Sequence, residues 1–288
     1  MTAATTTKAS RSRGFHVPLV HGRKFDSLLV YAIAYLAFLY VPVLFLPLFS
    51  FSDSIYVAFP IDGLTFKHYA AMAAQEPLID ALLNSVKVAA IVALIATILG
   101  TLAAKAITRY KLRGSGAVVG FIMVPFVIPG IILGISLLIL ANQVGVPLSL
   151  YTIGTAHVLI ATPFAMLVMI SRLEGFDKHL EEASLDLGEN AWMTFWRVTF
   201  RLALPGFIAC LLLTFTESFD EFILAFFLAG NEPTLPIYIW SQLRFPTKLP
   251  NVLALGACIL AVSFFVIAFA EWVRRRGVQP DKQEKMAR

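Results

Sequence analysis

The sequence predicts an all-α integral membrane protein with six transmembrane helices in one domain. Hydrophobic residues make up 58% of its 288 positions and charged residues only 14%, with a mean hydropathy of +0.78. A soluble domain carries about 25% charged residues. One protein core cannot enclose this much apolar surface, so we expect lipid to be the main solvent. Six apolar runs of about 20 residues, the length that crosses a bilayer as a helix, support the same fold class.

The six predicted spans are separated by polar or basic segments. Pro42 and Pro47 are expected to kink or end the first span, whereas Pro125, Pro129 and Pro163 are expected to be packing kinks rather than hinges. The predicted spans are residues 28–49, 82–104, 117–141, 151–170, 205–229 and 252–272, with a loop at 51–80 that contains a short interfacial helix around 66–74, a basic loop at 105–113, and a further loop at 230–251.

The distribution of Lys and Arg predicts the orientation of the chain. Nineteen of the 23 basic residues lie in the two tails and in the segments 105–116 and 172–204, whereas the other three loops hold three. Because cytoplasmic segments carry the excess of Lys and Arg, we expect both termini to be cytoplasmic. The predicted domains are a cytoplasmic N-terminal tail (1–27), a six-helix transmembrane domain (28–273) with a cytoplasmic loop (172–204), and a basic cytoplasmic tail (274–288).

The 172–204 loop predicts two short helices. Residues 178–187 are good helix formers with an acidic first turn, which is favourable at a helix N-terminus. Ala183 and Ser184 are small, so another surface can approach the backbone there. Gly188 can take a positive φ and end the helix. A second, amphipathic helix is expected over 190–199, with aromatic rings at the level of the lipid headgroups.

The run Glu182-Ala183-Ser184, followed by Gly188, resembles the Glu-Ala-Ala…Gly signature of permease subunits of ATP-binding-cassette (ABC) importers. The resemblance covers most of the chain and implies the type I importer permease fold. In that family a short coupling helix inserts into a groove on the ATPase subunit and converts its motion into rocking of the membrane helices. The resemblance implies an ATPase-docking set within residues 178–199: Glu182, Ala183, Ser184, Asp186 and Gly188.

The loop departs from the family pattern in one place. Where Ile-x-Leu-Pro is usual, this sequence reads Val-Thr-Phe-Arg from Val198 to Arg201, and a proline follows only at Pro205. The departure leaves the geometry of the second helix open. The alternative for the whole loop is an ordinary amphipathic helix that lies on the headgroup layer.

Further residues resemble, within this family, the second permease subunit of spermidine/putrescine importers and of their opine-type relatives. The resemblance implies a polyamine or a related small cationic amine as the solute, with an opine or an amino-acid-like compound as alternatives. The residues that carry it are Ser218-Phe219-Asp220-Glu221, Gly230, Thr234-Leu235-Pro236, Tyr238-Ile239-Trp240 and Asn251…Ala254-Leu255.

The resemblance also implies the partners. They are a second permease subunit, as a heterodimer, two ATPase subunits and an extracytoplasmic solute-binding protein, in a bacterial plasma (inner) membrane. The sequence itself contains no Gly-x-x-x-x-Gly-Lys phosphate loop, no metal-ligand spacing of His or Cys, and no Ser/His/Asp arrangement. We therefore expect a transport subunit that is not an enzyme, holds no cofactor or metal and binds no nucleic acid, while ATP and Mg²⁺ are used by the ATPase subunits.

Three carboxylates interrupt the fifth predicted span. Glu217, Asp220 and Glu221 are spaced i, i+3, i+4, which predicts that they share one helix face. Each costs roughly 2.5–3.5 kcal/mol at the centre of a membrane, so the three should face protein or water. A net negative cluster suits a cationic solute, and Phe219 and Phe222 can add cation–π contacts of roughly 0.5–2 kcal/mol each. These five residues form the predicted substrate path.

Other interpretations of the membrane residues stay open. The acids could hydrogen-bond a partner permease, pair with Lys87, or be protonated because they are buried. His157 is expected to be a satisfied core histidine rather than a solute contact, and Cys210 and Cys258 are expected to be small core residues. The alternatives to an importer subunit are an ion-coupled secondary transporter that uses the three carboxylates, and a non-transporting assembly subunit.

Five residues are expected near the outer surface. Asn84, Ser85 and Asn142 are expected to cap the second and third spans or to line an outer vestibule. Tyr238 and Trp240 fit an interfacial position, either as anchors at the headgroups or as contacts to a delivered ligand.

Overall fold

The structure is a computed structural model that describes residues 27–61, 63–110, 114–175 and 177–277, with side chains up to residue 265. The predicted tails lie outside the described residues, except for Ser27 and residues 274–277. The described residues divide into two compact units, one that ends at Phe45 and one that begins at Leu46. Throughout the described ranges the regular secondary structure is helical, and one isolated β-bridge joins Ser52 and Leu64.

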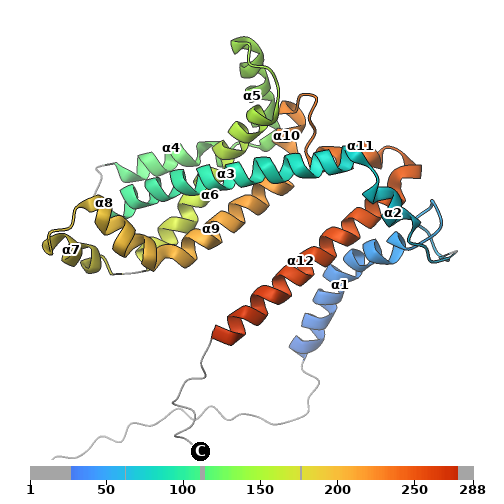
Figure 1. Cartoon of the computed structure of the whole chain (residues 1–288), viewed down its shortest axis with the longest axis horizontal. Helices are drawn as coiled ribbons and strands as arrows, with labels where there is room; N and C mark the ends of the chain where they lie inside the picture. Colours follow the sequence, from blue (N-terminus) through green and yellow to red (C-terminus); the bar gives the residue numbers. More distant parts are fainter. Residues whose placement is uncertain (1–26, 62, 111–113, 176, 278–288) are drawn as a thin grey trace, which may run out of the picture. The chain divides into compact units, whose positions relative to one another are not determined.

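Five described helical segments are long and apolar enough to cross a membrane, and a bent pair of helices makes a sixth if it counts as one span. This agrees with the predicted all-helical membrane fold. The elements (Figure 1) are α1 (Ser27–Ser50), α2 (Lys67–Ala73), α3 (Glu76–Arg109), α4 (Ser115–Val127), α5 (Gly130–Val144), α6 (Leu150–Glu174), α7 (His179–Asp186), α8 (Ala191–Thr194), the π-helix η1 (Phe195–Thr199), α9 (Phe200–Asp220), α10 (Ile223–Leu228), α11 (Leu235–Leu243), the 3₁₀-helix η2 (Pro246–Lys248) and α12 (Leu249–Gly277).

The first unit contains most of α1. The side chains of residues 27–45 are exposed throughout and mostly apolar, as expected of a segment that lipid or another chain surrounds. The helix continues through Pro42 and Pro47, so of the two predicted effects, a kink or the end of the span, these prolines do not produce the second. Proline is tolerated within transmembrane helices because neighbouring groups can satisfy the freed carbonyls.

In the second unit, α3 packs against both α6 and α9 (Figure 1). Small residues make the contact possible, since Ala89, Ala93 and Ala96 are fully buried. A Cβ placed on Gly100 would lie 2.6 Å from the Cβ of Ala165 on α6, which leaves room only for glycine. Small side chains let membrane helices approach closely, and this explains the tight packing of α3 on α6.

The helix α3 is longer than the predicted span of 82–104. It begins with Glu76 and a proline in the first turn, both favourable at a helix start, and it ends with Arg109, which is favourable at a helix end. The basic loop predicted at 105–113 is therefore partly helical. Asn84 and Ser85 lie inside the helix rather than at its end, so the prediction that they cap it is wrong.

The third predicted span is two helices. α4 and α5 are bent by 92° at the break between them. Pro125 lies inside α4 without breaking it, whereas α4 ends before Ile128, whose ψ of 131° is extended, and Pro129, with a ψ of 130°, precedes α5. Pro129 therefore lies at a break between two helices, which is a sharper bend than a kink within one helix. Past the break α5 packs on α10, where a Cβ on Gly134 would come within 2.7 Å of the ring of Phe227.

The fifth span starts earlier than predicted. α8, η1 and α9 run on without a break, so the predicted second loop helix at 190–199 is the beginning of the span. Asn190 sets its start, because its side chain accepts a hydrogen bond from the backbone N–H of Met193 at 2.8 Å. Pro205 lies inside α9 and does not end the helix.

The predicted loop at 230–251 contains a helix of its own. α11 begins after Thr234, with Pro236 in its first turn, where a proline fits without losing a helical hydrogen bond. α12 follows after η2 and covers the predicted sixth span of 252–272. The short helix predicted around 66–74 is confirmed as α2, which packs against α12, and its interfacial position stays a prediction.

Candidate functional site

The first candidate region is the helix α7 in the loop between α6 and α9. It begins where a carboxylate oxygen of Asp177 accepts a hydrogen bond from the backbone N–H of His179 at 3.0 Å, and its first turn is acidic as predicted. It ends at Gly188, whose φ of +90° confirms the predicted left-handed position. The N–H of Leu187 donates to the carbonyl of Ala183 at 3.1 Å. Local contacts within the loop thus define both ends of α7.

One face of α7 is exposed. Glu182, Ala183 and Asp186 lie on it, and Leu187 follows with 87% of its surface exposed. Leu187 thus places an apolar side chain in solvent at the end of this exposed face. Leu187 was not among the predicted site residues, although a leucine directly before a helix-ending glycine in a polar loop is a signal that could have identified it.

Ser184 faces the other way. Only 8% of its surface is exposed, and its hydroxyl group lies 3.1 Å from that of Thr194 on α8. The residue therefore ties α7 to the start of the fifth span. Its predicted place on the docking surface is wrong, because the side chain points into the fold of the loop.

The second candidate region is the break between α9 and α10. Asp220 is the last residue of α9, and Glu221 has a ψ of 120°, outside the helical range. The carboxylate of Glu221 accepts hydrogen bonds from the backbone N–H groups of Ile223 at 3.0 Å, Leu224 at 2.9 Å and Ala225 at 3.2 Å. The carboxylate thus caps α10 and replaces the helical hydrogen bonds lost at the break.

This break overturns the prediction of one shared helix face. The apolar run 205–229 conceals an interruption, so Glu221 is separated from the face that carries Glu217 and Asp220. The side chain of Glu221 is occupied by backbone groups of α10 and is only 13% exposed. We therefore remove Glu221 from the substrate path and assign it to the structure of the break.

His157 on α6 contacts residues on both sides of the break between α9 and α10, namely Ser218 and Glu221. It is 1% exposed, its Nδ1 lies 2.9 Å from the hydroxyl of Ser218, and its Nε2 lies 3.3 Å from Oε2 of Glu221. The prediction of a core histidine is confirmed, but only Nδ1 has a hydrogen-bond partner among the described residues, and the ion-pair contact of Nε2 with Glu221 was missed. A contact between residues 64 positions apart leaves no local signal in a single sequence.

Glu217 lies one turn before the end of α9. It is partly buried, and one of its carboxylate oxygens is shielded from solvent without a hydrogen-bond partner among the described residues. A buried acid without a partner is costly in a membrane protein. An added positive group, or a proton, would relieve that cost.

Asp220 is exposed and lines an open pocket of about 400 Å³ between the end of α9 and the helices α11 and α12. Phe219, Phe222 and Trp240 form the aromatic part of its wall. The rings of Phe222 and Trp240 lie 5.7 Å apart, and Arg244 lies 5.7 Å from the centre of the Trp240 ring. A carboxylate beside aromatic faces is an arrangement that attracts organic cations.

Two residues at the start of α11 hold this wall in place. The hydroxyl of Ser85 on α3 accepts a hydrogen bond from the backbone N–H of Leu235 at 2.8 Å. The hydroxyl of Tyr238 donates to the side chain of Gln75 at 2.5 Å, and burial raises the pKa of Tyr238, so this donor keeps its proton. Tyr238 is 8% exposed and is therefore not the headgroup anchor that the sequence suggested as one of its two roles.

Lys87 does not neutralise the acids. It lines a different cavity, of about 620 Å³ between α3 and α6, which also contains Glu232. No ion pair joins Lys87 to the three carboxylates in the part of the chain that the structure describes. The interpretation that the three carboxylates pair with Lys87 is therefore wrong.

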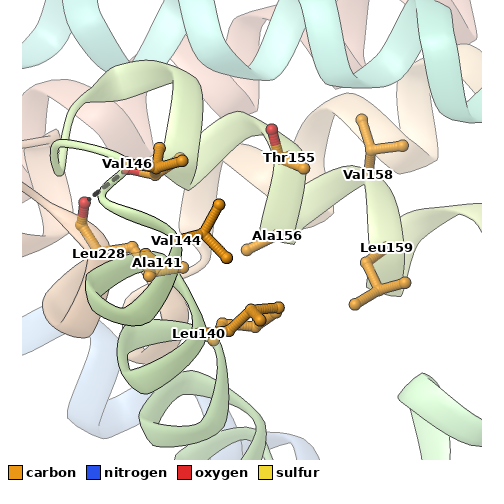
Figure 2. Close-up of a pocket in the computed structure, with 11 residues that line it drawn as sticks. Leu140, Ala141, Val144, Val146, Thr155, Ala156, Val158, Leu159 and Leu228 are labelled. Carbon is orange, nitrogen blue, oxygen red and sulfur yellow. Dashed lines mark hydrogen bonds between the residues drawn. The ribbon is translucent and has the colours of Figure 1, made fainter.

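A further cavity of about 590 Å³ lies between α5, α6 and α10 (Figure 2). Its labelled wall residues are apolar apart from Thr155, and a hydrogen bond from Thr152 to the carbonyl of Leu228 closes one side at 2.9 Å. No charged residue lines it, so it does not fit a small cation. The cavity at Lys87 pairs a basic with an acidic residue, whereas the pocket at Asp220 combines a carboxylate with aromatic walls, and this makes it the candidate site for a cationic solute.

Both regions lie in the part of the chain that matches a known family. Residues 96–278 match the family described as "Binding-protein-dependent transport system inner membrane component". The chain is 32% identical over 242 residues to the spermidine/putrescine transport system permease protein PotC of Haemophilus influenzae, with 84% of this chain and 93% of that protein covered. It is 34% identical over 257 residues to the putrescine transport system permease protein PotI of Escherichia coli, with 84% and 91% covered.

A solved structure shares the fold. It is that of a bacterial alginate ABC transporter in complex with its periplasmic protein bound to an alginate pentasaccharide. The TM-score is 0.67, the sequences are 18% identical, and the match covers 87% of this chain and 93% of the other. These matches confirm the type I ABC importer permease fold and the location in the inner membrane that the resemblance implied. The chain therefore belongs to the family of binding-protein-dependent transport system inner membrane components.

Proposed function

We propose that this chain is the permease subunit of an ATP-driven importer of polyamines or related small cationic amines, and that it forms the translocation path together with a second permease. The names of its relatives support the solute class. The observation that carries the proposal is the carboxylate of Asp220, which faces an open pocket with aromatic walls and makes no ion pair with any described residue.

The solute would bind by charge and by contact with aromatic rings. Asp220 supplies the negative charge, and Phe219 and Phe222 line the pocket beside it. Each cation–π contact is worth roughly 0.5–2 kcal/mol. Glu217, one turn earlier on α9, provides a second carboxylate for a solute with more than one ammonium group. A solute ammonium would supply the positive charge that the carboxylates lack within the described chain.

The coupling to ATP would pass through α7. The exposed face of Glu182, Ala183 and Asp186, with Leu187 at its end, would insert into a groove on the ATPase subunit. Gly188 gives the tight turn that lets this surface project. Closure of the ATPase subunits on ATP would move α7 and open the path outward to accept the solute. Hydrolysis would then reset it.

The full assembly would contain this chain, a second permease, two ATPase subunits and an extracytoplasmic solute-binding protein. ATP and Mg²⁺ would be bound by the ATPase subunits, and this chain would hold no cofactor. The excess of Lys and Arg in the tails and in the 172–204 loop supports placing both termini and α7 in the cytoplasm. The domain limits then follow as a tail at 1–27, a transmembrane domain at 28–273 and a tail at 274–288.

The ion-coupled alternative has less support from the geometry. It needs carboxylates that exchange a proton or an ion with the path, yet Glu221 is held by three backbone N–H groups. It would also give the exposed face of α7 no role. Uptake that stops with an uncoupler while ATP stays high would favour it over the importer.

The experiment is uptake by the reconstituted complex with Asp220→Asn. Loss of one charge contact of about 1.4 kcal/mol raises the KM for putrescine or spermidine about tenfold. Glu76→Gln is the matched control, because Glu76 is an exposed acid at the start of α3, away from the pocket. An unchanged KM for Asp220→Asn would remove Asp220 from the path. ATPase stimulation by an opine or γ-aminobutyrate, but not by polyamines, would refute the solute class.

A further inference from the structure

One carboxylate on α7 contacts the ends of the membrane helices. Glu181 is 12% exposed, and its Oε1 lies 3.4 Å from Nε of Arg109, the last residue of α3. The same oxygen accepts a hydrogen bond from the hydroxyl of Thr199 at 2.7 Å, at the point where η1 runs into α9. Arg109 also donates from Nη2 to the carbonyl of Leu173 in the last turn of α6 at 3.0 Å. The side chain of Glu181 therefore contacts α3 and the start of α9 directly, and Arg109 extends the connection to α6.

The neighbouring acid has different contacts. Glu182 is about half exposed, and its contacts are with Lys178 and His179 on its own short helix. Glu181 thus points into the protein where Glu182 points out of it. The two adjacent carboxylates divide α7 into an outer face that a partner can touch and an inner face that is bonded to the membrane helices.

The contacts of Glu181 suit the transfer of motion. The guanidinium group of Arg109 has fixed donor directions, so its bonds to α7 and α6 restrict orientation as well as distance. The partner Thr199 closes a π-helical turn, an irregularity that is frequent at functional positions. Lys105 on α3 adds a second contact to this turn, with its Nζ 4.6 Å from the centre of the Phe195 ring.

We propose that Glu181 is the positioning residue that transmits movement of α7 to α3, α6 and α9, through Arg109 and Thr199. The inference rests on the proposed docking of α7 onto an ATPase subunit. It adds the inner connection, which uses residues other than those of the docking face. Without this connection, α7 still binds the ATPase subunit but no longer moves the helices with it.

The test measures the number of solute molecules imported per ATP hydrolysed by the reconstituted complex. Glu181→Gln keeps the shape and an acceptor for Thr199 but removes the ion pair, and we expect this ratio to fall at least fivefold while the ATPase subunits still co-purify. Thr199→Val should lower the ratio, whereas Thr199→Ser, which keeps the hydroxyl, should retain it. Glu174→Gln, an exposed acid at the end of α6, is the control and should match the wild type.

A double-mutant cycle separates a connection from a general loss of stability. If Glu181 and Arg109 act together, Glu181→Gln with Arg109→Gln is no worse than either single variant. Multiplying defects, or a wild-type ratio in Glu181→Gln, would overturn the proposal. Failure of the docking itself looks different, because the ATPase subunits would then not bind the wild-type permease at all.

Discussion

The cap that Glu221 places on α10 can be tested by removing it. In Glu221→Ala, the N–H groups of Ile223, Leu224 and Ala225 lose their acceptor, and Nε2 of His157 loses its neighbour. Loss of a helix cap costs about 0.5–2 kcal/mol, and a hydrogen bond to a charged group contributes about 1.5–3 kcal/mol. We expect a total loss of about 2–4 kcal/mol, because some of the freed groups find other partners.

This loss corresponds to a change of about 30- to 700-fold in the folding equilibrium. Thermal denaturation of the purified protein in detergent measures it as a lower midpoint, by about 2–4 °C for each kcal/mol. Glu221→Gln, which keeps one carbonyl acceptor, should lie between Glu221→Ala and the wild type. Glu232→Ala is the matched control, because it removes an exposed acid from the loop after α10. Equal midpoints for Glu221→Ala and Glu232→Ala would refute the assigned role of Glu221.

Three further outcomes are expected. Gly100→Val should reduce the yield of folded, monodisperse protein in size-exclusion chromatography, because its side chain would collide with the backbone of α6, where a Cβ at position 100 would lie 2.7 Å from the nitrogen of Met166; a normal yield would contradict the close packing of α3 on α6. Gly188→Val should lower solute-stimulated ATPase activity while the protein stays in the membrane, because a positive φ costs an L-residue about 1–2 kcal/mol; full stimulation would count against a fixed turn there. Tags at either terminus should resist protease added outside intact spheroplasts, and digestion of either tag would overturn the proposed orientation.

Long apolar runs made most of the fold predictable. The central spans at α3, α6 and α12 were found because an uninterrupted apolar run of about 20 residues is typical of a helix that crosses a bilayer. Their exact ends were missed, since helices such as α3 continue into polar residues that hydropathy assigns to loops. The end of α7 was predicted correctly, because Gly188 both ends a helix and permits the positive φ found there.

The breaks within the apolar runs could not be located in this way. Pro129 signals an irregularity, but its backbone preference does not fix an angle of 92° between two helices. Glu221 was interpreted as a third acid on a continuous helix, because its role as a cap depends on where the helix stops. A carboxylate that precedes Ile223 and Leu224 in an apolar run is compatible with both structures.

Contacts between distant parts of the chain account for the remaining differences between the predicted and the observed sites. The partner of His157 lies on another helix, and so does the partner of Glu181. Ser184 looked suitable for docking because it is small, yet its hydroxyl faces Thr194. Composition and spacing identify which residues a loop offers, but the packing of the loop decides which of them face outward.

The central claim is that α7 docks onto an ATPase subunit, and cross-linking tests it most directly. Ala183→Cys and Asp186→Cys place thiols on the exposed face of α7, in a background without Cys210 and Cys258, and Tyr56→Cys places a control thiol in the loop before α2. With a short bifunctional reagent on the intact complex, we predict a covalent product with the ATPase subunit from positions 183 and 186 and none from position 56. If neither α7 position yields that product in a complex that hydrolyses ATP, the account of coupling is wrong.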